Sequence, residues 1–571
     1  MQKMKTTYIV MGLLAVLTAT SCKKKLDFQY DNRVNTEPMP LSSTRIINLA
    51  SATQLSINGK KLTSYMLPDI DGYYGPDQTR PTIYFPETGR MGITFTIPQE
   101  FVNATGGIDS IRFSSLGNKI GLPDSRKFSA KDNFNDPHDY YYIRLRPNIG
   151  TYQDSLVAVS RSVSPPSNPT NIKIRLLNLS SEPNGLSQPG VFRKGPMSLA
   201  WANGTTISGM ENIAPGSASA YIEMPYGTYQ LKVLEASGKE VQGNSSFVLN
   251  IATGTAMDYY GDIGVGGRKD TWLTYAPVKT FQPGGVYTIV VSMNYDCSIP
   301  TGNPNGETVN TEGNTFRIIS DISEPVNVIY SRVQAVNVTQ GTDVQWLVND
   351  KPLGNALSFT QQTDYKTFVT GVYTLKATDK SGATLAQQEL RLQPGDNITA
   401  WLYPAKDGKA TIALSSNNMS GKFFNGNAGE EGSYSMYKDN TPTWTRFMNF
   451  CSELDEVTFT TDDGQPFLAT PGSVAVNASQ HIQLGKPVTQ DPNVQLMLNM
   501  PGKVLVYASR PGITPGDWLS QITPLKSTDF IANPSLYKTP QLPNREPGYY
   551  TVALVGKKVG EARMIIIKHN K

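Results

Sequence analysis

Arg175-Leu-Leu-Asn-Leu-Ser-Ser-Glu182 is the clearest of four copies of one pattern along the chain. The other copies are RIINLAS from Arg45, RIISDISE from Arg317 and RFMNFCSE from Arg446. Their arginines are 130, 142 and 129 residues apart. Solenoid repeats usually recur every ~20–50 residues, so this longer period indicates tandem domains.

Each copy has the composition of one β-strand that leads into a turn. An arginine is followed by two apolar residues and then by a small polar residue. Residue types that tolerate positive φ in hairpins come next, at Asn58-Gly59, Asn203-Gly204, Asn349-Asp350 and Asp463-Gly464. Alternating segments such as Thr94–Ile97 and Thr288–Val291 also indicate strands, and helical periodicity is scarce. The sequence therefore predicts a nearly all-β chain.

A second pattern follows the first one at a distance. It reads GTYQLKV from Gly227, GVYTLKA from Gly371 and GYYTVAL from Gly548. These copies start 52, 54 and 102 residues after the preceding arginine of the first pattern. The longest spacing predicts an insertion in the fourth unit. In the first unit the nearest relative is YYYIRLR from Tyr140.

Three polar stretches separate the units and predict linkers. They are Ser162–Asn171, which is rich in proline, and the glycine- and asparagine-rich stretches Ser298–Asn314 and Asn417–Thr443. The predicted domains are residues 43–161, 170–297, 314–416 and 443–571. Units of about 100–130 residues with many short strands fit an immunoglobulin-like sandwich of two sheets.

The RxxNxxS opening, the hairpin after it and the later GxYTL strand together resemble the domain-of-unknown-function family numbered 4397. This family occurs in tandem in envelope lipoproteins of bacteroidete type. The resemblance covers most of residues 43–571 and implies a fold, and it brings no catalytic residue with it.

The first residues have the layout of a signal peptide. Lys3 and Lys5 precede an apolar run from Tyr8 to Leu17, which is about half of the roughly 20 residues that cross a bilayer. LTATSC, which ends at Cys22, resembles the lipobox of bacteroidete-type lipoproteins. We therefore expect a signal peptide over residues 1–21, acyl chains on Cys22 that hold the chain to a membrane, and a flexible tether over residues 22–42.

The expected address is the cell envelope, with an outer-membrane lipoprotein as the favoured form. The tether opens with Lys23-Lys24-Lys25, where some surface-exported lipoproteins carry an acidic pair. The sequence therefore leaves open whether the protein faces the periplasm or the cell surface. A formal charge of +4 without basic runs interleaved with aromatics argues against nucleic-acid binding.

The sequence offers few residues for catalysis or metal binding. Its three histidines, His138, His481 and His569, have no zinc-binding spacing, and no GxSxG motif accompanies them. The glycine-rich run from Gly261 lacks the ending of a phosphate-binding loop. Cys297 and Cys451 are expected to be buried free thiols, although their pairing stays open. We therefore expect no catalytic residue, no metal and no cofactor.

Two oxygen-rich loops, Asp69–Gly72 and Asp132–Asp136, are expected to be solvated turns and not calcium sites, because neither matches a complete calcium loop. The recurrent arginine is expected to pair with a carboxylate or to cap a loop carbonyl.

Aromatic side chains give the remaining hint of a ligand, because exposed rings stack on sugars or form hot spots in protein contacts. Most of the clusters are expected to pack in cores; these are Tyr73-Tyr74, Tyr140–Tyr142, and Trp272 with Tyr275. Tyr434, Tyr437 and Trp444 are the candidate ligand-binding residues, because they lie in or beside a glycine-rich linker.

The expected function is that of a non-catalytic envelope lipoprotein for protein binding, adhesion or assembly. The alternative is a glycan-binding accessory lipoprotein of an outer-membrane nutrient-uptake system, and an enzyme is a distant third. The ligand, the partner proteins and the oligomeric state stay open.

Overall fold

Strands dominate the described part of the chain, so the all-β prediction is confirmed. Met1–Pro40 and Leu41–Lys571 form two separate units, and the strands that the structure describes lie in the second. The computed structural model describes residues 39–571 except 51, 53, 65–80, 87–88, 90, 115–126, 149–150, 183–193, 242, 247–248, 251–254, 257–270, 275–277, 301–307, 418, 420–442, 471–472, 475, 490–491, 497–501, 538–545 and 547. The predicted signal peptide and Cys22 therefore lie outside the described residues.

The strands of residues 41–160, here called segment 1, form two four-stranded sheets with the orders β4-β1-β7-β8 and β3-β2-β5-β6. Ile46, Phe113 and Tyr142 belong to the hydrophobic core of this segment. The elements are β1 (Leu41–Asn48), β2 (Gln54–Ile57), β3 (Lys60–Lys61), β4 (Thr94–Pro98), η2 (Gln99–Phe101), β5 (Gly107–Ser114), β6 (Phe128–Lys131), β7 (His138–Asn148) and β8 (Thr151–Ser160).

Segment 2, residues 171–320, has β9 and β21 at the centre of its larger sheet, and β10-β14-β15 form a second sheet. Phe281, Tyr287 and Phe316 contribute to its core. The strands are β9 (Asn171–Leu179), β10 (Met197–Ala200), β11 (Ser217–Ala218), β12 (Ile222–Pro225), β13 (Gly227–Tyr229), β14 (Lys232–Glu235), β15 (Glu240–Val241), β16 (Gly243–Ser246), β17 (Leu249–Asn250), β18 (Thr255–Ala256), β19 (Thr271–Thr274), β20 (Lys279–Phe281), β21 (Val286–Pro300) and β22 (Thr308–Ser320).

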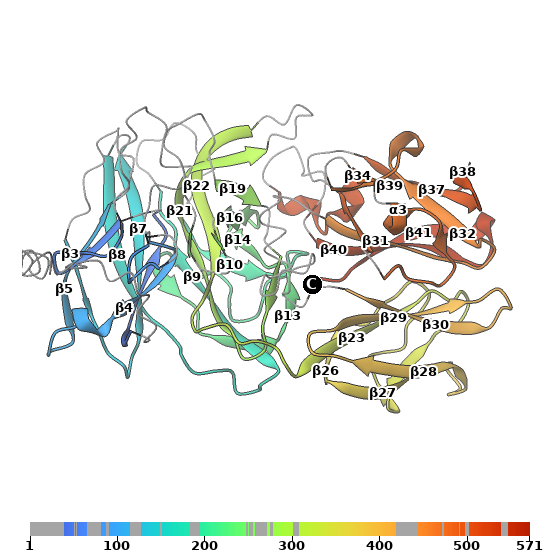
Figure 1. Cartoon of the computed structure of the whole chain (residues 1–571), viewed down its shortest axis with the longest axis horizontal. Helices are drawn as coiled ribbons and strands as arrows, with labels where there is room; N and C mark the ends of the chain where they lie inside the picture. Colours follow the sequence, from blue (N-terminus) through green and yellow to red (C-terminus); the bar gives the residue numbers. More distant parts are fainter. Residues whose placement is uncertain are drawn as a thin grey trace, which may run out of the picture. The chain divides into compact units, whose positions relative to one another are not determined.

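Segment 3, residues 330–416, repeats the arrangement of segment 1 with sheets β26-β23-β29-β30 and β25-β24-β27-β28 (Figure 1). Trp346 and Leu375 are fully buried in its core. The strands are β23 (Tyr330–Asn337), β24 (Gln345–Val348), β25 (Lys351–Pro352), β26 (Lys366–Val369), β27 (Gly371–Thr378), β28 (Thr384–Leu392), β29 (Asn397–Pro404) and β30 (Ala410–Ser416).

Segment 4, residues 443–568, has sheets β36-β31-β40-β41 and β35-β32-β37-β38 around a core that includes Phe447 and Phe459. Its elements are β31 (Thr443–Cys451), β32 (Glu456–Thr460), η3 (Asp462–Gly464), β33 (Leu468–Thr470), β34 (Ser473–Val474), α3 (Val476–Ser479), β35 (Ile482–Gln483), β36 (Asn493–Leu496), β37 (Lys503–Arg510), β38 (Ile513–Trp518), β39 (Leu525–Lys526), η4 (Ser527–Phe530), η5 (Pro534–Leu536), β40 (Gly548–Gly556), η6 (Val559–Glu561) and β41 (Arg563–Lys568). Cys451 is a buried free thiol here, as expected.

One topological rule unites the four segments. The opening strand, β1, β9, β23 or β31, pairs in parallel with a strand from late in the same segment, β7, β21, β29 or β40. In segments 1, 3 and 4, eight strands of the two sheets follow the orders D-A-G-H and C-B-E-F when they are lettered along the segment; β39 of segment 4, which pairs beside them with β37, is not lettered. Immunoglobulin constant domains have the orders ABED and CFG, so the two-sheet arrangement is shared and the strand order is not.

An asparagine holds the turn after each opening strand, three residues after the arginine or, in segment 3, after Gln334. Asn178, Asn337 and Asn449 each accept a hydrogen bond from the backbone N–H two residues further on. The side-chain amide of Asn48 brackets Ala52 by accepting from its N–H and donating to its carbonyl. Asparagine is frequent at such turns because its amide replaces a backbone partner.

The predicted third copy of the pattern is wrong. Arg317 lies on β22, which pairs with β21 as the last strand of segment 2. The topological counterpart of the other arginines is Gln334, which lies opposite Thr399 on the parallel strand. The Ser298–Asn314 stretch, expected as a linker, includes the ends of these two hairpin strands, since Pro300 pairs with Thr308.

The copies of the second pattern lie on strands that are not equivalent in the fold. Gly371 opens β27, which pairs antiparallel with β24, whereas Gly548 opens β40, which pairs in parallel with β31. The counterpart of β40 in segment 1 is β7, the strand of Tyr140. The spacing of 102 residues thus reflects a different strand and not an insertion before the same one.

Two of the predicted turns have the expected backbone. Asn58 and Gly59 have φ of 50° and 80°, and Asn349 and Asp350 have φ of 46° and 62°, which suits two-residue hairpin turns. Asp463 and Gly464 instead belong to the 3-10 turn η3.

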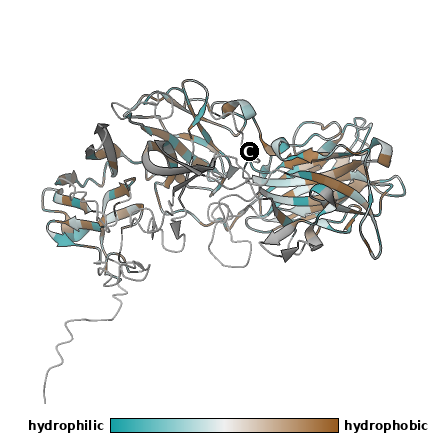
Figure 2. Cartoon of the chain, turned by 90° about the horizontal axis from the view of Figure 1, so that it is seen from above, coloured by the Kyte–Doolittle hydropathy of each residue, from teal (hydrophilic) through white to brown (hydrophobic). Residues whose placement is uncertain are grey.

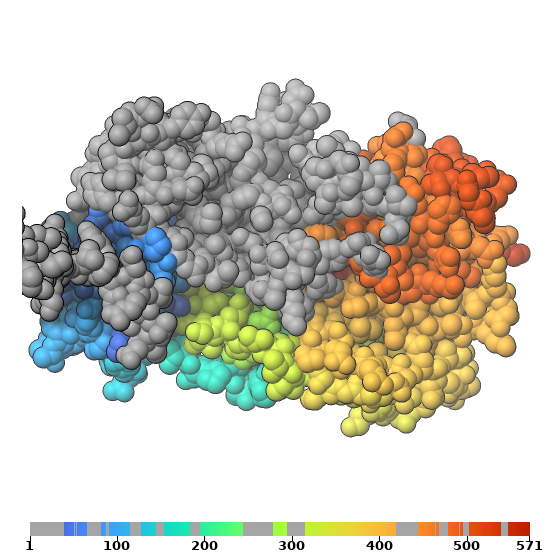
Figure 3. All heavy atoms as spheres, in the orientation of Figure 1, coloured from blue at the N-terminus to red at the C-terminus, as the bar shows by residue number. Residues whose placement is uncertain are grey.

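Hydrophobic side chains also join the segments. Ile47 and Tyr141 of segment 1 pack in one buried cluster with Leu177 and Val290 of segment 2. Trp401 of segment 3 packs similarly with residues of segment 4 that include Phe450. Figure 2 shows hydrophobic and hydrophilic residues mixed along the same strands, and Figure 3 shows atoms of segments 3 and 4 in contact. A strand of this kind faces its own core with alternate residues and a neighbouring segment with the others.

Candidate functional site

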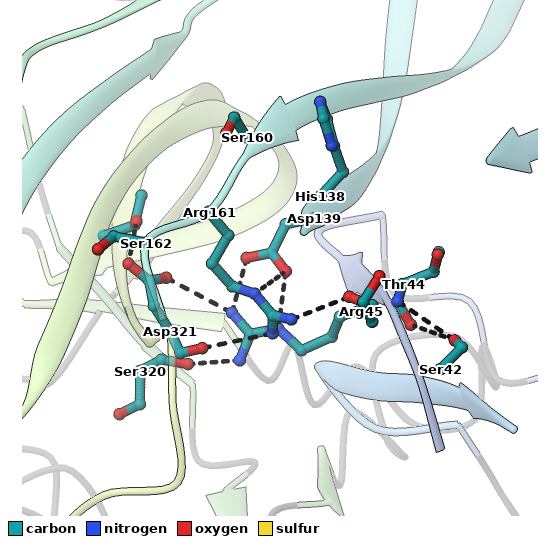
Figure 4. A network of polar contacts seen from close by, with 12 residues as sticks. Ser42, Thr44, Arg45, His138, Asp139, Ser160, Arg161, Ser162, Ser320 and Asp321 are labelled. Atoms are coloured by element: carbon teal, nitrogen blue, oxygen red, sulfur yellow. Dashed lines mark hydrogen bonds and ion pairs between the residues drawn. The ribbon is translucent and has the colours of Figure 1, made fainter. Parts of the chain in front are cut away.

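The arginine of the first opening strand lies in a buried ionic network between segments 1 and 2 (Figure 4). Arg45 donates from Nε and Nη2 to both carboxylate oxygens of Asp139, at 2.9 and 2.6 Å. Asp139 stands directly opposite on the parallel strand β7 and is fully buried. Arg161 lies on the other side of the same carboxylate, with Nε 3.5 Å from Oδ1. Two cations therefore share one buried anion.

Segment 2 completes this network. Asp321, the residue after β22, has Oδ1 3.4 Å from Nη2 of Arg45 and accepts from the hydroxyl of Thr288 at 2.7 Å. Arg175, opposite Thr288 on the opening strand β9, donates to that hydroxyl at 2.9 Å. Burial and the charge of Asp139 raise the pKa of Asp321 to about 6.

Arg45 and Arg175 also donate to the main-chain oxygen that ends the last strand of the other segment. Nη1 of Arg45 donates to the main-chain oxygen of Ser320, the final residue of β22, at 2.6 Å. Nη1 of Arg175 donates to the main-chain oxygen of Ser160, the final residue of β8, at 2.7 Å. Strand ends leave carbonyls that need partners when they are buried, and here the two segments supply these partners to each other.

Segments 3 and 4 contain the same arrangement with fewer charges. Gln334 stands where Arg45 does and donates to Thr399 Oγ1 at 3.1 Å, opposite on the parallel strand. Asn417, the residue after β30, donates to the same hydroxyl at 2.9 Å. It corresponds to Arg161, which follows β8 in segment 1 and lies beside Asp139. Arg446 donates to the main-chain oxygen of Ser416, the final residue of β30, at 2.5 Å.

His569 occupies the position of Asp321, directly after the last strand. Its Nδ1 lies 2.9 Å from the amide nitrogen of Gln334, and its Nε2 lies 2.7 Å from the hydroxyl of Thr551. An amide nitrogen only donates, so Nδ1 accepts and the proton is on Nε2. Burial and the charge of Arg446 lower the pKa of His569 to about 3, which keeps the ring neutral.

A third polar contact joins segment 2 to segment 4. Lys232 and Glu546 are both fully buried, and Nζ lies 2.6 Å from Oε1. Burial raises the pKa of Glu546, but the charges of Lys568 and Lys232 outweigh it and bring the value down to about 2. The end of the chain adds backbone contacts, since Lys571 donates to Thr228 and accepts from Gln230.

These networks are built for holding segments together. Their ionised groups are largely removed from water and are held by carboxylates or by hydroxyl and main-chain oxygens, so they can neither bind an exposed ligand nor exchange protons readily with solvent. The recurrent arginine therefore has the structural use expected from the sequence. The part of the chain that is described contains no group of three or more His, Cys, Asp or Glu side chains that could hold a metal.

The candidate ligand-binding residues fall in different places. Tyr434 and Tyr437 lie outside the described residues. Trp444 is on β31, half-buried, and packs in a cluster with Val278, Met419 and Tyr549. That cluster draws on segments 2 and 4 and on the chain after β30, so the indole belongs to a junction core.

The other sequence candidates are accounted for where they are described. Tyr140, Tyr141 and Tyr142 are buried, as expected for packing. Asp132 accepts hydrogen bonds from the N–H and the hydroxyl of Ser43, so it holds the beginning of β1. The loop Asp69–Gly72 and the glycine-rich run from Gly261 to Arg268 lie outside the described residues, as do the side chains of Trp272, Tyr275 and Cys297.

One surface escaped the sequence analysis. On segment 4, Trp518 is 55 % exposed and lies directly opposite Tyr507 on the neighbouring strand. His481 directly precedes β35 of the same sheet, with Nδ1 2.9 Å from Glu456 and Nε2 2.6 Å from the hydroxyl of Thr514. The sequence contains one sign of this surface, because Tyr507 and Trp518 lie on either side of the Pro511-Gly512 turn.

A hydroxyl, an imidazole and a carboxylate in line can activate a nucleophile. Thr514 is exposed, however, on strand β38, two residues after the Pro511-Gly512 turn of the hairpin. Catalysis of this kind also uses donors for a developing oxyanion and the exclusion of water. The contacts of His481 with Glu456 and Thr514 therefore serve better to hold the β37-β38 hairpin in place.

No family model matches the sequence, and no curated protein matches it. Solved structures with partial similarity include the Bacillus anthracis TIE protein, at 10% identity over 91% of this chain and 73% of that chain, with a TM-score of 0.11. A leucine-rich repeat protein from Bacteroides thetaiotaomicron shares 10% identity over 42% of this chain and 26% of its own, with a TM-score of 0.10.

The Bacteroides ovatus mixed-linkage glucan utilization locus SGBP-B, solved with a mixed-linkage heptasaccharide, shares 14% identity over 57% of this chain and 64% of its own, with a TM-score of 0.09. At these TM-scores the similarities support neither a fold nor a function. Among the described residues, no helix has the length and apolar character to span a membrane.

Proposed function

We propose that the chain is an exported envelope lipoprotein, anchored in the outer membrane through acyl chains on Cys22. Its mature part consists of four tandem β-sandwich domains of immunoglobulin-like architecture, resembling the family numbered 4397. The domains present outer sheet faces for protein binding, adhesion or assembly, and they carry no catalytic residue or cofactor.

The observation that supports this proposal is the reciprocal closure of strand ends between segments. Arg45 and Arg175 each donate to the last carbonyl of the other segment, and Arg446 does the same to Ser416. Buried polar contacts of this kind fix one arrangement of neighbouring domains, because any other arrangement leaves charges without partners. A rigid array loses less conformational entropy when it binds an extended partner, which favours a scaffold that presents ligand-binding surfaces.

A second candidate is a glycan-binding accessory lipoprotein of an outer-membrane nutrient-uptake system. The exposed Trp518 beside Tyr507 favours it, because a flat exposed ring suits stacking on a sugar.

The test is to incubate the purified mature protein, residues 23–571, with envelope and host-type proteins and glycans. Retention and product release are measured in the same samples. Retention of a ligand without any product supports the proposal. Product that accumulates in proportion to the protein, and disappears when one carboxylate such as Glu456 is replaced by Gln, overturns it.

A further inference from the structure

The sheet β35-β32-β37-β38 of segment 4 has one face towards its core and one face away from it. Val457 and Phe459 of β32, and Val504 and Val506 of β37, point into the core. Side chains alternate along a strand, so Glu456, Thr458 and Tyr507 point to the opposite face. Residues directly opposite in an antiparallel pair share a face, which places Trp518 beside Tyr507. We call Tyr507, Trp518, Glu456, His481 and Thr514 the aromatic face.

Trp518 is unusual in its exposure. Among the described residues, the exposed large hydrophobic side chains are mostly aliphatic, and Phe134 and Trp518 are the aromatic ones. Trp is highly buried on average because its ring gains much from leaving water. Trp518 is the last residue of β38 and pairs with half-buried Tyr507 of β37, so its indole belongs to the sheet and not to a loop tip.

The polar groups of the aromatic face are held in place. Glu456 and Thr514 engage the two ring nitrogens of His481. His481 also has a φ of 54°, a region that residues with a Cβ seldom adopt and that is enriched at ligand sites. Its N–H donates to the hydroxyl of Thr458 at 3.2 Å, which secures this backbone. The face thus combines a ring platform with oriented hydrogen-bonding groups.

The charges of the hairpin are balanced. Arg510 and Asp517 form an ion pair across it, and Glu456 lies against His481. No excess positive charge remains on these residues to attract a phosphate, an acidic peptide or an anionic sugar. A neutral ligand with a flat apolar surface and hydroxyl groups at its edge fits this chemistry. A pyranose ring has that form.

Segment 3 provides the internal comparison. The equivalent strand β27 has Thr374 and Lys376 at outward positions, while Leu375 and Ala377 face the core. Lys376 is engaged there by Asp350 at 2.6 Å. Ordinary solvated polar residues therefore suffice for this fold, and the aromatic pair of segment 4 is not needed to make the sheet.

We propose that the aromatic face of segment 4 binds a neutral polysaccharide, with one sugar ring stacked on Trp518 and Tyr507 and its hydroxyls at the rim formed by His481, Glu456 and Thr514. This inference rests on the proposed function of the chain as a binding protein. It adds the class of ligand and the residues that bind it. It also assigns a role to Tyr507 and Trp518, which the sheet does not need in order to form.

The experiment uses the mature protein, residues 23–571, with Trp518→Ala and the matched control Phe134→Ala, which also removes an exposed aromatic ring. Circular dichroism and thermal unfolding check the fold of each variant. Barley mixed-linkage glucan, laminarin, xylan, mannan and starch are tested by affinity electrophoresis and calorimetry. Polygalacturonate and a tryptic digest of envelope proteins serve as anionic and protein probes.

The expected result is retention by at least one neutral polysaccharide, a rise in Kd of about tenfold or more in Trp518→Ala, and no change in Phe134→Ala. Trp518→Phe should keep part of the affinity, since it retains a ring. Absence of retention by every neutral polysaccharide, or equal retention by Trp518→Ala, overturns the inference.

Two other outcomes separate this inference from the proposed function. Capture of peptides or polygalacturonate that depends on Trp518 refutes the neutral glycan while the binding role stands. Release of reducing ends that is abolished in Thr514→Val refutes the non-catalytic role, whatever the ligand.

Discussion

Nη1 of Arg175 lies 2.7 Å from the main-chain oxygen of Ser160, so the opening strand of segment 2 closes the last strand of segment 1. Arg45 donates in the same way to the main-chain oxygen of Ser320, which ends the last strand of segment 2. Arg446 of segment 4 donates to that of Ser416, which ends the last strand of segment 3. One arginine position thus explains both the repeat in the sequence and the contact between neighbouring segments.

Arg45→Ala is expected to destabilise the protein by about 3–5 kcal/mol, because it leaves the fully buried carboxylate of Asp139 without its bidentate partner. The free energy of unfolding in urea measures the effect. The double variant Arg45→Met with Asp139→Leu should recover part of the loss, since it removes both charges of the pair, whereas Arg161 loses the carboxylate that it shares with Arg45. A double variant that is less stable than Arg45→Ala alone would contradict the ion-pair explanation.

A surface ion pair gives the matched control. Arg391 and Glu389 are 69% and 63% exposed, with Nη2 3.4 Å from Oε1. Arg391→Ala is expected to change stability by less than about 0.5 kcal/mol in the same urea titration.

His569 predicts a loss of stability in acid. Its pKa of about 3 in the folded chain lies below the ordinary value of 6.5, so between these values the unfolded chain binds a proton that the folded chain does not. Stability should therefore fall as the pH drops from about 6.5 towards 3, by up to about 1.4 kcal/mol per pH unit from this group.

The measurement is urea unfolding between pH 7 and pH 4 for the native chain and for His569→Gln. The variant cannot take up this proton, so its stability should depend less steeply on pH. Curves that run parallel over the whole range would exclude His569 as the cause.

Segment 1 is expected to be less stable when it is separated from segment 2. A chain of residues 39–161 leaves Ile47 and Tyr141 without the partners Leu177 and Val290, and it removes the main-chain acceptor for Arg45. Thermal unfolding should occur at a lower temperature than for residues 39–321. Equal unfolding temperatures would show that the interface contributes nothing to stability.

Cys22→Ala is expected to release the protein from the membrane fraction, because the predicted tether has no other apolar anchor. Fractionation of cells fed a labelled fatty acid measures both label and location. Membrane association that persists in the variant without label would refute lipid anchoring.

The sequence predicted the strand class well, because the alternation of apolar and polar residues directly expresses which face of a strand is buried. It also found three of the four opening strands. Gln334 was missed because it keeps the hydrogen-bonding role of Arg45 with a different residue type, next to Thr399 in place of Asp139. A motif search compares residue types, whereas the equivalent position in the fold is identified by the residue opposite it on the parallel strand.

The junctions and the aromatic face were beyond sequence reasoning for a related reason. Asp321 and His569 occupy equivalent places at strand ends, yet one is an acid and the other a base. Tyr507 and Trp518 are eleven positions apart in the sequence and become neighbours only through the register of a hairpin. Contacts between separate strands depend on register, which composition does not determine.

Hydrogen exchange of the mature protein and its Arg175→Ala variant tests most directly whether the strand-end contacts couple segments 1 and 2. The prediction is faster exchange in β7 and β8 of segment 1 as well as in β21 and β22 of segment 2, with β23 and β29 unchanged, because Arg175 closes Ser160. Faster exchange confined to segment 2 would contradict the coupling.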